Sequence, residues 1–259
     1  IVAEKIGHEG IAVHYREELE EIQGKRGKVA GVRLKSGRSI KCQAVGVAVG
    51  VRPNLDLVRE LPIRLDKGIL VDQFMQSSQP GVFAAGDVAQ AYDRWTGENN
   101  LDILWPSAIN EGRAAGNSMV DLVRGRQPTY HYQKSSPFNC ALLFGLHLTV
   151  IGRVGNNDTA NIEQLAYLSR GSSHVWTSPF TSNYRSAWDK KGFNSLRIVL
   201  ADGRLVGAIL MGNQELADPL RRLIEQEVDL SQYEPALLSG GDQLPQVLLR
   251  AWRDWHQRW

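Results

Sequence analysis

Residues 77–87, with the sequence SSQPGVFAAGD, place the strongest constraint on how this chain folds. The apolar run at residues 82–85 has the length of a strand shielded on both faces, and it stops at Gly86 and Asp87. Glycine removes the side chain where a ligand would touch the backbone, and open α/β sheets bind ligands at the carboxyl ends of their strands. A carboxylate there can accept hydrogen bonds from sugar-like hydroxyls. The alternative is that Asp87 only caps a turn.

Two further informative segments precede residues 77–87. They are AVGVRPN at residues 48–54 and GILVD at residues 68–72. The ordered set of three resembles the FAD-dependent pyridine nucleotide-disulfide oxidoreductase superfamily. In that superfamily the first segment leads the chain out of the nicotinamide domain, and the Gly-Asp segment is the second flavin-binding motif. The most similar branches are the nitrite reductase flavin subunits, the rubredoxin reductases and the NADH oxidases.

The resemblance implies an α/β and α+β protein in three parts. Residues 1–51 are expected to be the C-terminal remnant of a NAD(P)-binding domain, and residues 52–127 the C-terminal half of a Rossmann-like FAD-binding domain. Residues 128–259 are expected to form a smaller α+β domain. The GxGxxG fingerprint that would bind the FAD pyrophosphate is absent, and the chain begins at Ile1. We therefore expect an N-terminal FAD/NAD(P)-binding segment to be missing.

Local patterning predicts the individual elements. Strands are expected at residues 11–13, 28–35, 39–41, 45–49, 68–72, 82–85, 140–151, 196–200 and 205–210, with an Asp-Gly turn between the last two. Helices are expected at residues 107–124, 215–228 and 244–259, and a polar loop at residues 93–104. Residues 17–23 are ambiguous, because their charges suit a helix but the segment is short. The inward face of the first helix is predicted to consist of Ala108, Gly112, Ala115, Gly116, Met119 and Val123.

The start of that helix is a second candidate site. Pro106 suits a helix start, and Ser107 can cap it. The resemblance implies that this helix points its N-terminus at the flavin, where N–H groups and the helix dipole stabilise negative charge on the reduced ring. Trp105, Pro106, Ser107 and Ala108 are therefore predicted to lie near FAD. The alternative is an ordinary capped helix that packs against a sheet.

Gly50 and Arg52 lie at the predicted crossing between the domains. Gly50 allows the backbone to approach a cofactor, whereas Arg52 could simply pair with a carboxylate. Direct contact of these two residues with a cofactor is left open.

The implied chemistry is hydride transfer from NAD(P)H to FAD and electron delivery to an acceptor. We expect enzymatic activity in a longer chain and none in these 259 residues alone, to which no catalytic residue is assigned. The rival interpretations are a non-catalytic partner-binding module and one piece of a split flavoprotein. The electron acceptor, which could be a small molecule or a redox protein, and a homo-oligomeric state are left open.

Composition excludes several other classes. The net charge of +2 requires no nucleic acid partner, and no apolar run reaches the ~20 residues that span a bilayer. The two cysteines, Cys42 and Cys140, form no CxxC pair, and no residues have metal-ligand spacing. We expect both cysteines to be packing residues in a protein of a reducing compartment, the cytoplasm. None of the six histidines precedes a proline, which argues against the glutathione reductase branch.

The last predicted helix carries a stripe of large apolar residues. They are Leu248, Trp252, Trp255 and Trp259. The simplest interpretation is a terminal helix that docks on its own domain. The alternative is a contact with a partner or a membrane surface.

Overall fold

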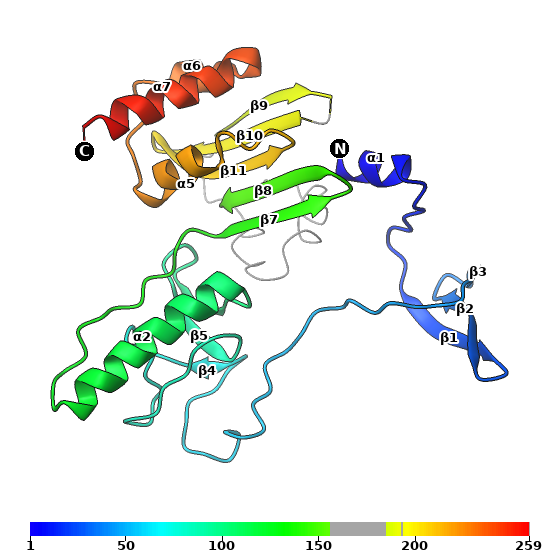
Figure 1. Ribbon diagram of the computed structural model, residues 1–259, viewed down its shortest axis with the longest axis horizontal. Helices are drawn as coiled ribbons and strands as arrows, with labels where there is room; N and C mark the ends of the chain where they lie inside the picture. Colours follow the sequence, from blue (N-terminus) through cyan, green and yellow to red (C-terminus); the bar gives the residue numbers. More distant parts are fainter. Residues whose placement is uncertain (156–184, 193, 259) are drawn as a thin grey trace. The chain divides into compact units, whose positions relative to one another are not determined.

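The computed structural model describes residues 1–155, 185–192 and 194–258 (Figure 1). By its internal contacts the chain divides into two units, Ile1–Val51 and Arg52–Trp259. Each unit is described below by itself.

The first unit holds a helix and a small antiparallel sheet. After α1 (Val2–His8) come β1 (Leu19–Lys25), β2 (Lys28–Leu34) and β3 (Ser39–Lys41), in the order β1-β2-β3. The predicted hairpin of β2 and β3 is confirmed. The ambiguous residues 17–23 largely belong to strand β1, because pairing with β2 supplies the backbone hydrogen bonds.

Two strands predicted in this unit are wrong. Residues 11–13 and 45–49 form no strand, and Val47 and Val49 are exposed. An apolar run indicates a buried strand only where neighbouring elements cover both faces, and the sheet of this unit ends at β3.

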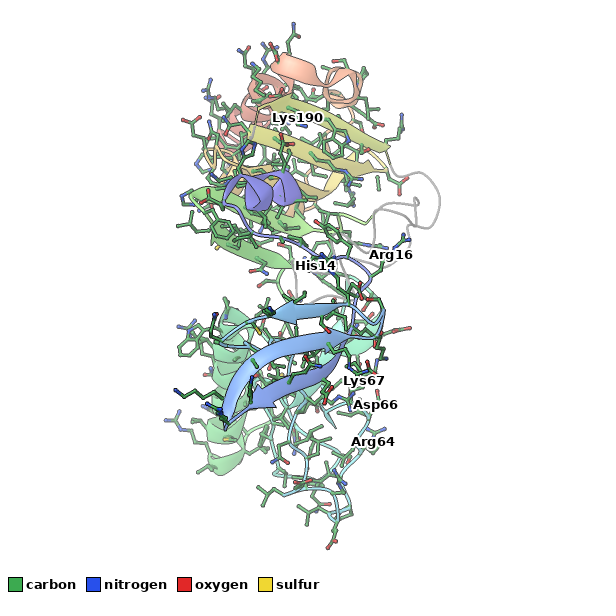
Figure 2. All side chains as sticks on the ribbon, turned by 90° about the vertical axis from the view of Figure 1, so that its right-hand side faces the viewer. His14, Arg16, Arg64, Asp66, Lys67 and Lys190 are labelled. Atoms are coloured by element: carbon green, nitrogen blue, oxygen red, sulfur yellow. The ribbon has the colours of Figure 1, made fainter. Side chains whose placement is uncertain are left out.

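The second unit begins with a small mixed sheet. In it β4 (Ile69–Leu70) pairs in parallel with β5 (Ala89–Asp93), which pairs in antiparallel with β6 (Glu98–Leu101). Gln90 on β5 ties the preceding segment to this sheet: its Nε2 donates to Asp66 Oδ2 at 2.8 Å and its Oε1 accepts from the Gly68 N–H at 3.1 Å. Arg64, Asp66 and Lys67 of that segment are labelled in Figure 2.

Two predictions around this sheet are wrong. Residues 82–85 form no ladder strand; a single bridge joins Phe83 to Gln76. Gly86 and Asp87 therefore precede β5 instead of ending a strand. The predicted polar loop at residues 93–104 contains β6, because its backbone groups pair with β5 in a hairpin that apolar patterning does not reveal.

Helix α2 (Trp105–Val123) confirms the predicted helix, and Gly125 follows it at a φ of 71°. The predicted inward face is largely wrong. The buried residues are Glu111, Ala114, Ala115, Ser118 and Asp121, whereas Met119 and Val123 are 45% and 89% exposed. The buried carboxylates on this face have hydrogen-bond donors that compensate their loss of water, so the more polar face turns inward.

The rest of the second unit is a five-stranded antiparallel sheet in the order β7-β8-β11-β10-β9. Its strands are β7 (Phe138–Leu143), β8 (Leu146–Gly152), β9 (Arg185–Lys191), β10 (Asn194–Ala201) and β11 (Arg204–Met211). The predicted hairpin of β10 and β11 is confirmed, with Asp202 and Gly203 at φ of 49° and 72°. The single strand predicted at residues 140–151 is instead the hairpin of β7 and β8, because Phe144 and Gly145 reverse the chain at positive φ.

Helices cover one face of this sheet (Figure 1). They are α5 (Ala217–Glu225), α6 (Glu234–Ser239), the 3₁₀ turn η1 (Gly241–Gln243) and α7 (Leu244–His256). Leu248 of α7 is fully buried, and Trp252 and Trp255 pack against the same core, which supports docking of the stripe on its own domain. Trp259 lies outside the described residues. Among the helices that the structure describes, none is long and apolar enough to cross a membrane.

Candidate functional site

The turn of Gly86 and Asp87 lies against the first turns of α2. Gly86 has a φ of 79°, and a Cβ placed on it would lie 3.6 Å from Ala108 Cβ. Space therefore admits a side chain here, but the left-handed backbone favours glycine. The Asp87 carboxylate is exposed and has no hydrogen bond or ion pair with any described residue. The turn thus presents a carboxylate that is available to a ligand.

A buried glutamate on α2 anchors this turn. Glu111 is 1% exposed, and its Oε2 accepts the Gly86 N–H at 2.7 Å. Its Oε1 accepts the Tyr132 O–H at 3.3 Å. Because the donor is the backbone of the residue before Asp87, this bond fixes the position from which the Asp87 side chain projects.

Glu111 belongs to a buried cluster of ionisable groups. The Lys134 ammonium lies 2.8 Å from Asp93 Oδ2 and 3.5 Å from Asp102 Oδ2, and all three side chains are almost fully buried. Ser107 donates from Oγ to Asp102 Oδ2 at 2.7 Å, while Asp102 Oδ1 is buried without a hydrogen-bond partner. The ammonium group of Lys134 therefore contacts two buried carboxyl groups, and Glu111 interacts electrostatically with Lys134 and Asp102.

Burial sets the protonation of this cluster. It raises the pKa of Glu111 to about 7, with a further contribution from Asp102, against the opposing effects of the Gly86 N–H, Tyr132 and Lys134. Burial also raises the pKa of Asp102, although Lys134 and Ser107 act in the opposite direction. The pKa of the Tyr132 hydroxyl is raised by burial and by Glu111. At neutral pH the protonated and ionised forms of Glu111 are therefore close in free energy.

The start of α2 lacks the side-chain cap that was predicted for it. Trp105 is the first residue of the helix and is 80% exposed, and Pro106 occupies the first turn. No side chain caps the helix, because the N-cap position is occupied by Leu104. Ser107 is the third residue of the helix and bonds to Asp102. The N-terminus therefore keeps N–H groups of the first turn without a capping side chain, which favours an anion or a partial negative charge.

The other predicted positions lie on the segment where the two units meet in sequence. Gly50, in the first unit, has a φ of 90°, and Arg52 is exposed at the start of the second unit. The structure describes each within its own unit. Cys42 is half-buried and Cys140 is exposed on β7, so Cys140 is not the packing residue that was expected.

Sequence reasoning missed the anchoring residues. Glu111 stands among residues whose spacing was interpreted as an apolar face, and Tyr132 and Lys134 were assigned to the start of another domain. The only local signal is that Glu111 lies at helical spacing from Ala114, Ala115 and Ser118, the positions that are buried.

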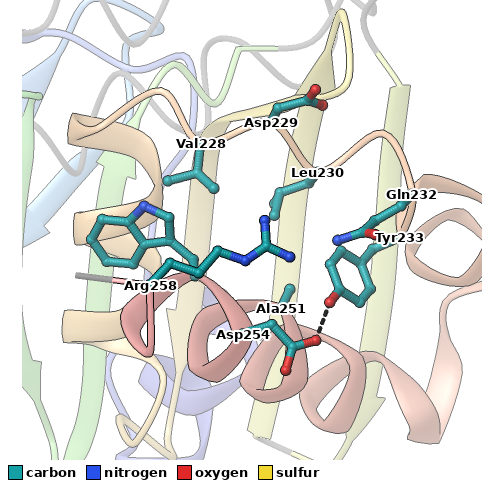
Figure 3. A pocket seen from close by; sticks show the side chains of 9 residues that line it. Val228, Asp229, Leu230, Gln232, Tyr233, Ala251, Asp254 and Arg258 are labelled. Carbon is teal, nitrogen blue, oxygen red and sulfur yellow. Dashed lines mark hydrogen bonds between the residues drawn. The ribbon is translucent and has the colours of Figure 1, made fainter.

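Elsewhere the described residues form two hollows beside α7. The wider one, of ≈ 380 Å³, is lined by Leu249 and by the polar side chains of Gln246, Arg250, Arg253, Asp254 and Gln257. The smaller hollow, of ≈ 40 Å³, lies between α7 and residues 228–233, where the Tyr233 hydroxyl donates to Asp254 (Figure 3). Such a volume holds a few water molecules at most. No cluster of three or more His, Cys, Asp or Glu side chains in the described part of the chain could hold a metal ion.

Comparison with known proteins shows which family and which relatives this chain resembles. The family profile of the pyridine nucleotide-disulphide oxidoreductases matches residues 1–112. These residues belong to that family. A Drosophila melanogaster protein named pyridine nucleotide-disulfide oxidoreductase domain-containing protein 1 is 27% identical over 237 residues, which are 88% of this chain and 45% of the relative. A NADH oxidase of Methanocaldococcus jannaschii is 26% identical over 219 residues, which are 84% of this chain and 45% of that enzyme.

Solved structures share the fold. A FAD-dependent pyridine nucleotide-disulphide oxidoreductase from Desulfovibrio vulgaris matches with a TM-score of 0.69 at 19% identity, over 96% of this chain and 58% of its own. A ferredoxin reductase from Rhodopseudomonas palustris matches with a TM-score of 0.65 at 20% identity, over 89% of this chain and 50% of its own. The predicted fold class is confirmed. The chain spans about half the length of each of these four proteins.

Proposed function

We propose that this chain is the rear part of a flavoprotein oxidoreductase that passes a hydride from NAD(P)H to FAD and electrons on to an acceptor. Family membership of residues 1–112 and the similarity to a NADH oxidase support the reaction class. In this proposal residues 1–51 belong to a NAD(P)-binding domain, residues 52–127 to a FAD-binding domain and residues 128–259 to a C-terminal domain that carries no redox group of its own.

The observation that carries the proposal is the available carboxylate of Asp87 on an anchored turn. The Glu111 bond to the Gly86 N–H holds the backbone, and no described protein group competes for the Asp87 oxygens. A fixed carboxylate is suited to accept hydrogen bonds from the hydroxyls of the FAD ribityl chain, because little conformational entropy is lost on binding. We therefore assign Asp87 as the ribityl-binding residue.

The start of α2 would act on the same cofactor. Gly86 lies next to Ala108 in the first turn of the helix, so Asp87 and the helix N-terminus are neighbours. When bound, FAD supplies the ring that accepts the hydride and becomes more negative. The N–H groups near Trp105 and Ser107, together with the helix dipole, would stabilise that charge. Gly50 and Arg52 are proposed as further contacts at the crossing between domains.

A second surface of α2 supports the view that further protein covers this site. The exposed residues Trp105, Ile109, Met119, Val120 and Val123 recur at helical spacing along one face. Between them Gly112 and Gly116 leave open space where a Cβ would stand. A stripe of this length is typical of a face that other protein covers. The same observation favours the split-flavoprotein alternative, in which a companion chain supplies that cover and the pyrophosphate site.

The acceptor is proposed to be a small molecule or a redox protein. One structural neighbour, with a TM-score of 0.64 at 16% identity, comes from the crystal structure of the covalent putidaredoxin reductase–putidaredoxin complex. Two cysteines without a disulfide are consistent with a reducing compartment, for which we propose the cytoplasm.

Binding of FAD tests the proposal in two steps. The 259-residue chain alone should bind FAD more weakly than micromolar in calorimetric titration, because the anion site for the pyrophosphate is absent from its sequence. In the longer protein, or with the companion chain, Asp87→Ala should weaken FAD binding by about tenfold or more. Asp56→Ala, which removes another exposed carboxylate of the same unit, serves as the matched control. Wild-type flavin content and affinity in Asp87→Ala would refute the assignment.

A further inference from the structure

We propose that Glu111 and Tyr132 form a proton-holding pair that positions the Asp87 turn, so that the turn is held firmly when Glu111 is ionised and loosely when it is protonated. Glu111 acts here as a positioning residue, through the backbone of Gly86. That the positioned carboxylate binds FAD rests on the proposed function, whereas the pair itself rests on the contacts described above.

The two oxygens of Glu111 have different partners. Oε2 accepts the backbone N–H of Gly86 at 2.7 Å, and Oε1 accepts the phenolic O–H of Tyr132 at 3.3 Å. A backbone N–H can only donate, whereas a phenol can donate or accept. A proton taken up by Glu111 therefore resides on Oε1, from which it is donated to the Tyr132 oxygen.

Protonation at Oε1 changes the other bond of the carboxyl group. The bond from Gly86 to Oε2 is charge-assisted while Glu111 is ionised and becomes an ordinary neutral bond afterwards. Hydrogen bonds to charged acceptors are shorter and about twice as strong as neutral ones. A proton on Oε1, shared with Tyr132, therefore weakens the hydrogen bond that the Gly86 N–H donates to Oε2 of the same carboxyl group.

The surroundings favour an exchangeable proton at this pair. Asp102, from the segment before α2, and Lys134, from the segment after it, both act on Glu111, and Lys134 is already engaged by Asp93 of β5. Two further titratable residues lie beside the pair in sequence, and both are exposed. Asp87 follows Gly86, and His131, which packs on Phe74, precedes Tyr132. One ammonium group cannot fully compensate three buried carboxyl groups, so one of them readily binds a proton.

The amide of Gly86 reports directly on the pair in the 259-residue chain without cofactor. Labelling with ¹³C-carbonyl alanine and ¹⁵N-glycine selects the three Ala–Gly junctions of the sequence, at Gly31, Gly86 and Gly116. We expect the Gly86 amide proton to move upfield as pH falls through about 7, with a single midpoint, while the other two signals stay nearly constant. A Gly86 signal that does not titrate would overturn the proposal.

Three variants identify the titrating group. Glu111→Gln keeps an acceptor for Gly86 but cannot ionise, so the titration should vanish. Tyr132→Phe removes a donor that favours the ionised form, so the midpoint should move to higher pH. Asp121→Asn makes the matched change at another buried carboxyl of α2, whose pKa Arg126 holds low, and should leave the titration unchanged. Persistence of the titration in Glu111→Gln, or an unmoved midpoint in Tyr132→Phe, would contradict the pair.

A fourth variant separates this inference from the proposed function. Asp87→Ala leaves Glu111, Tyr132 and the Gly86 N–H in place, so the Gly86 titration should persist. If it persists and FAD affinity in the longer protein is unaffected by Asp87→Ala, the proposed function fails and the pair stands. If the titration is absent from the wild-type chain while Asp87→Ala still loses FAD, the pair fails and the function stands.

Discussion

The backbone N–H of Gly86 donates a 2.7 Å hydrogen bond to Oε2 of Glu111, 25 residues further along the chain. This bond joins the turn that presents Asp87 to the buried face of α2. Glu111 also interacts electrostatically with Asp102 and Lys134 of the buried cluster. The predictions below test the parts of this arrangement and of the domain that follows it.

Glu111 should make the stability of the chain depend on pH. Its pKa in the folded protein, about 7, is above the ordinary value of 4.5, so the folded state binds more protons than the unfolded state between these values. Ionised Glu111 therefore destabilises the fold: the cost is absent below about pH 4.5, grows as pH rises and is complete above about pH 7. Urea unfolding at about pH 5 and pH 8 should show that Glu111→Gln gains stability relative to wild type at the higher pH, by up to about 3 kcal/mol. An equal difference at both pH values would contradict this assignment.

Lys134 should contribute strongly to the stability of the fold. Lys134→Met leaves Asp93 and Asp102 buried without a cation, which should destabilise the fold by about 3–5 kcal/mol. Adding Asp93→Asn should recover part of the loss, because one uncompensated charge is removed. Lys35→Met, which breaks an exposed pair with Glu18, is the control and should change little. Chemical denaturation of the three proteins measures the effect, and equal losses in Lys134→Met and Lys35→Met would refute it.

Leu248 should anchor the last helix to the sheet. Its side chain is 0% exposed in the core shared with α5 and α6, so Leu248→Ala should cost about 2–5 kcal/mol. Leu142→Ala removes the same atoms from an exposed position on β7 and should change stability by about 0.5 kcal/mol or less. Thermal unfolding followed by tryptophan fluorescence compares the two. If Leu142→Ala lost as much stability as Leu248→Ala, the assignment of Leu248 to the core would be contradicted.

Cys140 should have no part in electron transfer. The thiol is exposed on β7, and the only other cysteine, Cys42, belongs to the other unit. Cys140→Ser in the flavin-loaded longer protein should leave the rate of flavin reduction by NAD(P)H nearly unchanged in stopped-flow measurements. A large loss of rate with the fold intact would show that this domain carries a redox thiol.

Local sequence patterns predicted the hairpins of β2 with β3 and of β10 with β11, and the helices α2, α5 and α7. They missed the hairpins of β5 with β6 and of β7 with β8, and the short helices α1 and α6. Asp202 and Gly203 determine a tight turn by their backbone preferences, and the apolar runs on either side form the two paired strands. The patterns failed at residues 45–49 and 82–85. There an apolar run alone could not indicate whether a neighbouring strand was available to complete the hydrogen bonds.

The sequence by itself identified Gly86 and Asp87 as a candidate site and the family that residues 1–112 match, because short motifs and their order are local properties of the chain. Only the tertiary structure decided which face of α2 is buried and what holds the turn. Gly86, Glu111 and Tyr132 are distant in sequence, and the burial that raises the pKa of Glu111 comes from the elements packed around it. The free energy of a buried carboxyl group depends on those neighbours, and no local pattern encodes them.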